Sequence, residues 1–270
     1  APSLFHNVGN AHLEAGRRDS AQHYFRRALG LDPYMLEAYK GLVKALRGEE
    51  RLGEAIEVLD EALRLWKGDE TLSLMLAECY SGLGQVEDAR AVYRRLGKTP
   101  GQTWALLARE ALRRGNWQRA YDGLVEALRG DVSAELYNDL GASLVGLGRI
   151  EEGLQAFRQA ARLDPKMAGA FANIGRVYVQ HGRQIEAIAA LRRAVELEPG
   201  NGALFALLGQ AYEEMGQWDE AQNSYYQAVR CAPKSVAYRI NLAYAYQELG
   251  HPRKAENSYR AAIALNEESV

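Results

Sequence analysis

The chain repeats one pattern about every 34 residues, and this period constrains its fold more than any other feature. A small residue recurs in register at Ala21, Ala55, Ala89, Ala120, Gly153, Ala187, Ala221 and Ala255. The steps between these positions are 34, 34, 31, 33, 34, 34 and 34 residues. A fixed period of this length indicates an array in which each unit packs only on its neighbours. The sequence therefore divides into eight units: 2–35, 36–69, 70–100, 101–133, 134–167, 168–201, 202–235 and 236–269.

Each unit contains two stretches of helical period, separated by a stop signal. In the sixth unit, Ile174 and Tyr178 are four residues apart and so lie on one face of a first helix. Gly182 then ends this helix, and Pro199 ends the second one. Glu50 stands where the second unit should have its glycine. The pattern predicts an all-α fold of helix-turn-helix units.

Small residues also predict where the two helices of a unit cross. Helices approach closely only where their side chains are small, and Gly175 and Ala187 are expected to mark this place in the sixth unit. A larger side chain at such a position is expected to cost about 1–3 kcal/mol.

These positions resemble the tetratricopeptide repeat family, whose period is 34 residues. The seventh unit carries the whole motif, in the residues Phe205, Leu208, Gly209, Tyr212, Gly216, Ala221, Tyr225, Ala228 and Pro233. The resemblance covers essentially the whole chain. It implies a right-handed superhelical α-solenoid whose first helices line a concave, peptide-binding groove.

The register breaks once, in the stretch "RRLGKTPGQTW", where one step shortens to 31 residues and Pro100 lies out of place. We therefore expect one continuous solenoid with an irregular junction near 97–103. The junction would separate units one to three (1–100) from units four to eight (101–270).

No catalytic or metal-binding motif is present in the sequence. It has no phosphate-binding loop, nucleophile elbow or zinc-protease motif, and its five histidines are scattered. Cys79 and Cys231 are expected to be small buried residues without a disulfide. We therefore predict no enzyme activity, no cofactor and no metal. A net charge of −2 argues against nucleic-acid binding, and no apolar run approaches the roughly 20 residues of a membrane span.

The groove positions that the family resemblance implies differ along the chain. The predicted binding residues are Asn7, Asn10, Lys40, Lys44, Arg47, Met75, Glu78, Arg109, Arg113, Asn138, Asp139, Asn173, Arg176, Gln210, Asn241 and Tyr244. The early units are basic, and two interpretations of them stay open: a site for an acidic segment, or a solvated face with local pairs such as Glu37 with Lys40. The later units offer asparagines, whose amides can pair with a peptide backbone.

The sequence predicts a non-catalytic scaffold or adaptor that binds a protein or peptide partner. The alternative is the substrate-recruiting arm of a larger enzyme, such as a glycosyltransferase, with its catalytic domain outside this chain. Ile263 and Leu265 lack a following unit to cover them, so we expect this face to be covered by self-association through the C-terminal repeat or by further residues of the native protein. Arginine-rich, lysine-poor repeats favour a bacterial source, in the prokaryotic cytoplasm or periplasm, and the missing initiator Met suggests a piece of a longer protein.

Overall fold

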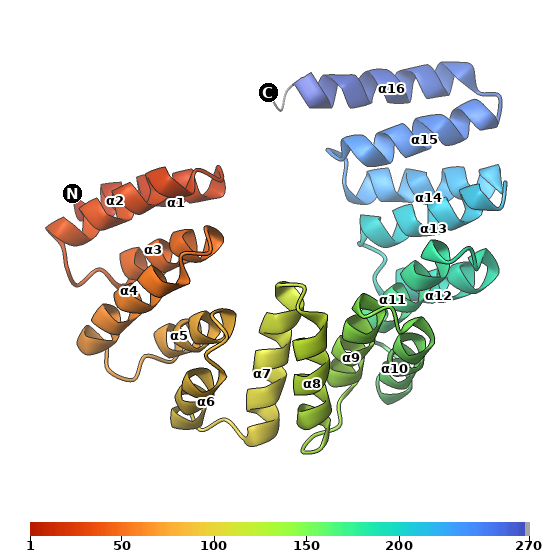
Figure 1. Ribbon diagram of the computed structural model, residues 1–270. Helices are drawn as coiled ribbons and strands as arrows, with labels where there is room; N and C mark the ends of the chain where they lie inside the picture. The colour runs from red at the N-terminus through yellow and green to blue at the C-terminus, as the bar shows by residue number, and fades with distance from the viewer. Residues whose placement is uncertain (268–270) are drawn as a thin grey trace. The chain divides into compact units, whose positions relative to one another are not determined.

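The computed structural model describes residues 1–267, which form sixteen α-helices and no strand (Figure 1). The helices are α1 (Pro2–Glu14), α2 (Arg18–Leu31), α3 (Leu36–Gly48), α4 (Leu52–Leu65), α5 (Glu70–Gly82), α6 (Val86–Arg95), α7 (Pro100–Arg113), α8 (Trp117–Leu128), α9 (Ala134–Gly146), α10 (Ile150–Leu163), α11 (Ala168–Gln180), α12 (Gln184–Leu197), α13 (Gly202–Glu214), α14 (Trp218–Cys231), α15 (Val236–Glu248) and α16 (Pro252–Glu267). Each of the eight predicted stretches, called repeats from here on, holds two of these helices, so the all-α helix-turn-helix array is confirmed.

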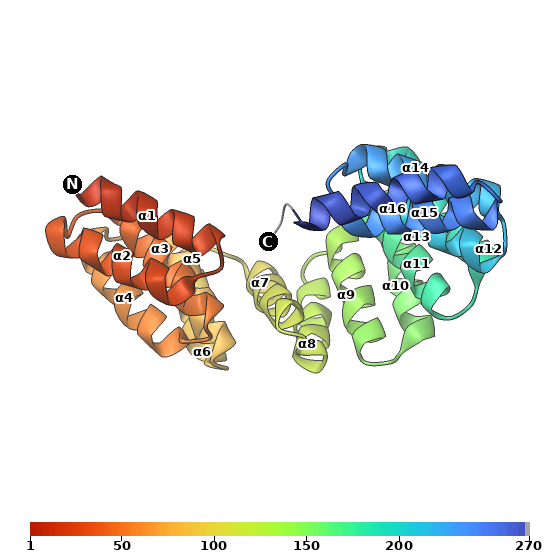
Figure 2. The ribbon, with the colours of Figure 1, turned by 90° about the horizontal axis from the view of Figure 1, so that it is seen from above.

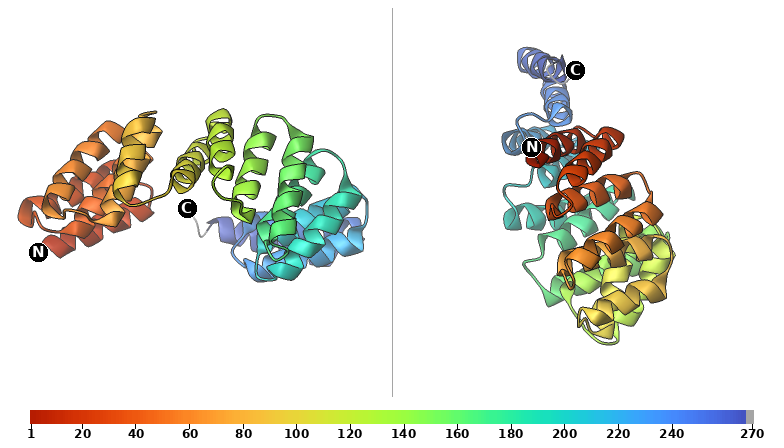
Figure 3. Two further views of the ribbon diagram at one scale, coloured as in Figure 1. Left: turned by 90° about the horizontal axis from the view of Figure 1, so that it is seen from below. Right: turned by 90° about the vertical axis from the view of Figure 1, so that its left-hand side faces the viewer.

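The chain divides into two compact units, and each is described by itself. The first is Ala1–Asp131, with α1 to α8, and the second begins at Val132 and holds α9 to α16. Figures 2 and 3 show the helices from other sides. The expected junction near 97–103 lies inside the first unit, between α6 and α7. A soft division at that place stays a prediction.

Within each unit, the helices pack in the order that a repeat array requires. The two helices of a repeat form a hairpin, and each second helix also packs on the next first helix, as α2 does on α3 and α12 does on α13. First helices of neighbouring repeats also contact each other directly, in the pairs α1–α3, α5–α7, α9–α11 and α11–α13. In a curved stack, the helices on the inner side approach most closely. We therefore place the first helices on the inner face of each unit.

The turn inside each repeat depends on a residue with left-handed backbone geometry. The seven glycines predicted to stop a first helix all have a positive φ, between 69° and 84°; they are Gly16, Gly84, Gly115, Gly148, Gly182, Gly216 and Gly250. Glu50 occupies the same place in the second repeat and has a φ of 60°. Because this conformation brings Cβ close to the backbone, the glutamate adopts it at a cost that glycine avoids.

Replacing Glu50 with glycine is expected to raise the free energy of unfolding by about 0.5–1 kcal/mol, after the extra flexibility of the unfolded chain is subtracted. Gly84→Ala, at a φ of 84°, is the matched control and should lower it by about 1 kcal/mol. Urea unfolding of both variants measures the two changes. An unchanged or less stable Glu50→Gly variant would contradict this account of the turn.

The two helices of a hairpin meet at small residues. A Cβ atom on Gly175 would lie 2.5 Å from Cγ of Leu191 on the facing helix, which shows a close approach there; the crossing of Gly175 with Ala187 itself stays a prediction. The first-helix and second-helix small residues do meet in the fifth repeat. There, a Cβ atom on Gly153 would lie 3.0 Å from the carbonyl oxygen of Gly141.

The core of each unit is filled by one large residue per repeat, four positions after the recurring small residue. Phe25 and Tyr93 serve this role in the first unit, and Phe157, Leu191 and Tyr225 in the second. All five side chains are 0% or 1% exposed. In several repeats, the large residue of the second helix packs where a glycine of the first helix has no side chain, as Phe157 does against Gly141. This close packing fixes the first helix, and with it the inner face, relative to the second helix.

Candidate functional site

The inner face of the first unit carries the basic residues predicted on α3 and α7, and most of their charges are paired. Lys40 Nζ lies 3.0 Å from Glu37 Oε1, which confirms the local pair. Arg47 Nη1 lies 2.6 Å from Glu78 Oε2, and Arg113 Nη2 lies 3.2 Å from the other oxygen of the same carboxylate. Glu78 on α5 therefore bridges α3 to α7.

A second carboxylate, which sequence reasoning missed, completes this network. Glu110 is 3% exposed and lies 2.5 Å from Arg113 Nη2, while Arg114 Nε donates to its other oxygen at 2.8 Å. The sequence could have indicated these ion pairs, because Glu110 precedes Arg113 by three residues and Arg114 by four, the spacings at which side chains of one helix meet. Because most of the cations already have carboxylate partners, this face is closer to neutral than the sequence implied.

The remaining predicted residues of the first unit differ in accessibility. Lys44 is exposed and has no ion pair within the described residues, so it is available to a ligand. Asn7 and Arg109 are also exposed, and Asn10 Nδ2 lies 3.3 Å from the ring of His6. Met75, by contrast, is 8% exposed and packs in the core.

In the second unit, the predicted asparagines join neighbouring repeats. Asn173 Nδ2 on α11 donates to Asn138 Oδ1 on α9 at 2.8 Å, and Arg176 Nη2 donates to Asn173 Oδ1 at 2.7 Å. Asp139 lies half-buried beside Asn138. These amides are thus held in place between two first helices, and Arg176 remains exposed to solvent.

Further along the second unit, the inner face becomes acidic and aromatic. Gln210 Nε2 donates to Glu214 Oε1 at 3.0 Å, and Glu213 accepts a hydrogen bond from the hydroxyl of Tyr225. Asn241 is half-buried on α15. Tyr244, 38% exposed, stands edge-on to Trp218, with 5.6 Å between ring centroids. This ring pair offers an exposed aromatic surface next to carboxylates.

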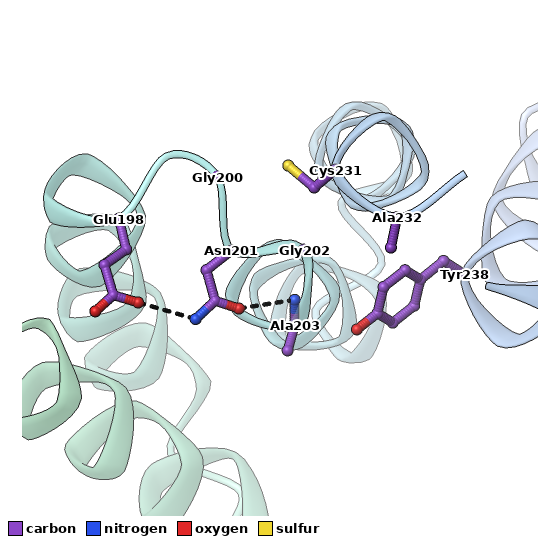
Figure 4. A pocket seen from close by; sticks show the side chains of 8 residues that line it. All are labelled: Glu198, Gly200, Asn201, Gly202, Ala203, Cys231, Ala232 and Tyr238. Atoms are coloured by element: carbon purple, nitrogen blue, oxygen red, sulfur yellow. Dashed lines mark hydrogen bonds between the residues drawn. The ribbon is translucent and has the colours of Figure 1, made fainter. Parts of the chain in front are cut away.

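A cavity of about 600 Å³ lies in the second unit around the start of α13 (Figure 4). Its polar groups mostly pair with one another: Asn201 donates to Glu198 at 2.9 Å and accepts from the backbone N–H of Ala203 at 3.2 Å. A Cβ atom on Gly202 would lie 3.2 Å from the ring of Tyr238. We therefore interpret this cavity as the capped end of a helix, rather than a reactive site.

The two cysteines have different environments. Cys79 is 0% exposed, and burial raises the pKa of its thiol to about 11. Cys231 is only half-buried, which corrects the expectation of two buried thiols; its Sγ donates to the carbonyl oxygen of Pro199 at 3.6 Å. Both thiols are free.

At pH 8, iodoacetamide is expected to modify Cys231 and to spare Cys79 in the folded protein. A raised pKa keeps the Cys79 thiol protonated until the pH approaches about 11, and the thiolate is the reacting form. Mass spectrometry of tryptic peptides measures the two extents of labelling, with urea-unfolded protein as the control in which both react. Equal labelling of the folded protein at both positions would contradict the expectation.

Searches for a metal site and a membrane span give no candidate in the described residues. No three His, Cys, Asp or Glu side chains between residues 1 and 267 gather closely enough to hold a metal ion. No helix in that range is long and apolar enough to cross a membrane.

Comparison with known families identifies the repeats. The family model of the tetratricopeptide repeat matches residues 8–70, and the model of the cilia and flagella-associated protein 70 C-terminal domain, which consists of the same repeats, matches residues 68–269. The second match alone covers more than half of the chain. The chain belongs to the tetratricopeptide repeat family. The resemblance inferred from Gly, Ala and Pro positions is thereby confirmed.

Curated relatives share part of the chain. Human protein O-mannosyl-transferase TMTC1 is 26% identical over 179 residues, which are 63% of this chain and 20% of that protein. Mouse anaphase-promoting complex subunit 7 is 26% identical over 162 residues, 58% of this chain and 28% of that protein. Mouse interferon-induced protein with tetratricopeptide repeats 3 is 31% identical over 138 residues, 49% of this chain and 34% of that protein. The chain thus spans between a fifth and about a third of the length of these relatives.

Among solved structures, similar ones include the tetratricopeptide protein MamA. MamA from residue 41 to its end, from Desulfovibrio magneticus RS-1, superposes with a TM-score of 0.58 at 21% identity, covering 63% of this chain and 97% of that one. A double mutant of MamA gives a TM-score of 0.59 at 21% identity, covering 64% and 97%. At this identity, the likeness shows the fold.

Proposed function

We propose that this protein is a non-catalytic interaction scaffold that binds a peptide segment of a partner on the inner face of its first helices. The observation that carries the proposal is that the first helices of each compact unit carry accessible polar side chains: Lys44 on α3 in the first unit, and Arg176 on α11 and Tyr244 on α15 in the second. A relative that is by name a subunit of the anaphase-promoting complex supports a role in assembly. The partner remains to be found by pull-down with mass spectrometry.

We further propose that the partner segment is acidic where it meets the first unit. Lys44 has no competing carboxylate, and Lys40 pairs with Glu37, which is itself 64% exposed on its side chain. Such an exposed pair contributes little to stability, so Lys40 can exchange partners readily. Arg47 and Arg113 would have to share Glu78 with the ligand.

The triple variant Lys40→Glu, Lys44→Glu and Arg47→Glu is expected to bind the captured partner at least about tenfold more weakly at 20 mM salt. The difference should shrink at 500 mM salt, because exposed charges are then screened over a few ångströms. Isothermal titration calorimetry of the purified partner segment measures both affinities.

A control for this variant is needed because Arg47→Glu also destroys the ion pair with Glu78. Glu78→Gln removes the same pair but leaves all cations in place, and it should bind an acidic segment as tightly as wild type or more tightly. Wild-type affinity in the triple variant at low salt would show that the basic face is only solvated surface.

A second candidate function is the substrate-recruiting arm of a larger enzyme, such as a glycosyltransferase. The similarity to one fifth of protein O-mannosyl-transferase TMTC1 favours it, since that protein is by name an enzyme. An antibody raised against this chain isolates the native protein, and peptide sequencing by mass spectrometry distinguishes the two. Peptides of a glycosyltransferase domain in the same chain support the arm, and a native chain without such a domain contradicts it.

We also propose self-association through the C-terminal repeat. Ile263 on α16 is 58% exposed, whereas the matching Val195 inside the array is half-buried by its neighbours. A second copy placed on this face would bury it, and a monomer by sedimentation at high concentration would exclude that. A prokaryotic cytoplasm or periplasm stays a proposal, because the relatives named above come from animals and the similar structure from a bacterium.

A further inference from the structure

A cavity lies where the repeat register breaks, beside the short helix α6. Helix α6, the second helix of the third repeat, has 10 residues. The second helices of the other repeats, apart from the last, have 12 or 14. The chain leaves the helix after Arg95 and re-enters one at Pro100 (Figure 1). A cavity of about 290 Å³ lies between the end of α6 and the first turn of α7, inside the first unit.

The walls of this cavity are mainly cationic. Five residues line it, namely Arg90, Arg94, Lys98, Pro100 and Thr103. The three cations follow each other at intervals of four residues, so they point to one side of the short helix and the turn after it. No carboxylate is among the lining residues.

The acidic partners of these cations lie at the solvent edge. Arg90 Nη1 is 2.8 Å from Glu87, and Lys98 Nζ is 3.2 Å from Glu70; the two carboxylate side chains are 76% and 63% exposed. Such exposed pairs exchange readily for a better-placed anion. Arg94 is exposed and has no ion pair within the described residues, so its full charge is available.

Two further features complement the charge of an anion. Thr103 is 5% exposed yet contributes to the cavity wall, and its hydroxyl has no hydrogen-bond partner in the described part of the chain. It belongs to the first turn of α7, a helix of 14 residues whose amino-terminal end carries partial positive charge. The Arg90 guanidinium is held 5.0 Å above the ring of Trp104, which limits its motion.

We propose that this cavity binds a phosphate group. A phosphate monoester carries nearly two negative charges and three acceptor oxygens, which match two guanidinium forks, an ammonium and a hydroxyl donor. A carboxylate carries half the charge and fewer acceptors. The phosphate can come from a phosphorylated side chain of a partner or from a free phosphate. The inference is independent of the inner-face site, because Arg109 and Arg113 do not line this cavity and lie six and ten residues beyond Thr103 on α7.

The test uses the full chain and two probes, inorganic phosphate and the pentapeptide Ala-Gly-phosphoserine-Gly-Ala, titrated by calorimetry in low-salt buffer. The pocket variant is Arg94→Gln with Lys98→Gln, which spares Arg90 and its ring contact. The matched control is Arg64→Gln with Arg129→Gln, which removes the same charge from exposed positions of the same unit. Circular dichroism of both variants verifies the helical fold.

Wild type and the control are expected to bind the probes alike, and the pocket variant at least about tenfold more weakly, as expected when charge-assisted hydrogen bonds are lost. Tighter binding of the phosphopeptide identifies a phosphorylated side chain as the source, and equal binding identifies free phosphate; both support the proposal. It is overturned if wild type binds neither probe, if the control loses as much as the pocket variant, or if the peptide with Asp in place of phosphoserine binds equally well.

Discussion

Phe25→Ala is expected to lower the free energy of unfolding of the first unit by about 3–5 kcal/mol. The ring is 0% exposed and lies between two helices of different repeats. Its atoms are 2.7 Å from the Cβ position of Gly9 on α1 and 2.5 Å from that of Gly41 on α3. Because Gly9 and Gly41 are glycines, neither of them has a side chain to fill the space that alanine leaves. The first repeat would lose its main contact with the second.

Hydrogen exchange monitored by mass spectrometry measures this effect along the chain. In a repeat array, stability is nearly a sum of neighbour terms, so faster exchange should be confined to the first unit and be largest in α1 to α3. The second unit serves as an internal control because Phe25 has no role in its core. An equal loss of protection in both units, or a loss below about 1 kcal/mol, would contradict the role assigned to the ring.

Gly141→Ala is expected to lower the free energy of unfolding of the second unit by about 1–3 kcal/mol, although alanine is the better helix former. The added Cβ would lie 2.5 Å from Cδ1 of Phe157, closer than real carbon contacts. Phe157 is 1% exposed, so its ring cannot move aside without displacing the rest of the core. The hairpin α9–α10 would therefore have to open.

Gly169→Ala is the matched control in the same unit. This glycine lies in α11, and a Cβ atom there would meet nothing within 4 Å. The same substitution should therefore be neutral or stabilise by up to about 1 kcal/mol. Thermal and urea unfolding of the two variants should move in opposite directions. A similar change in both would mean that helix propensity, rather than the close approach of Phe157, decides the outcome.

Much of the fold could be predicted from the sequence because its signals are local. A glycine such as Gly182 ends a helix through its own backbone freedom, and residues three or four apart share a helix face whatever surrounds them. Repeated eight times in register, these signals determined the helix order and the family. They also located the shortened step before Pro100, although they did not reveal a cavity there.

The tertiary structure alone decided which side chains meet. Arg47 and Glu78 are 31 residues apart and on different helices, so no local pattern shows that they lie 2.6 Å from each other. The same holds for the bond between Asn138 and Asn173, 35 residues apart. Coulomb energy depends on the separation of the charges in space, and that separation is set by how far apart the glycines allow the helices to pack. For this reason the sequence predicted a basic face, and only the packed helices showed that most of its charges are already paired.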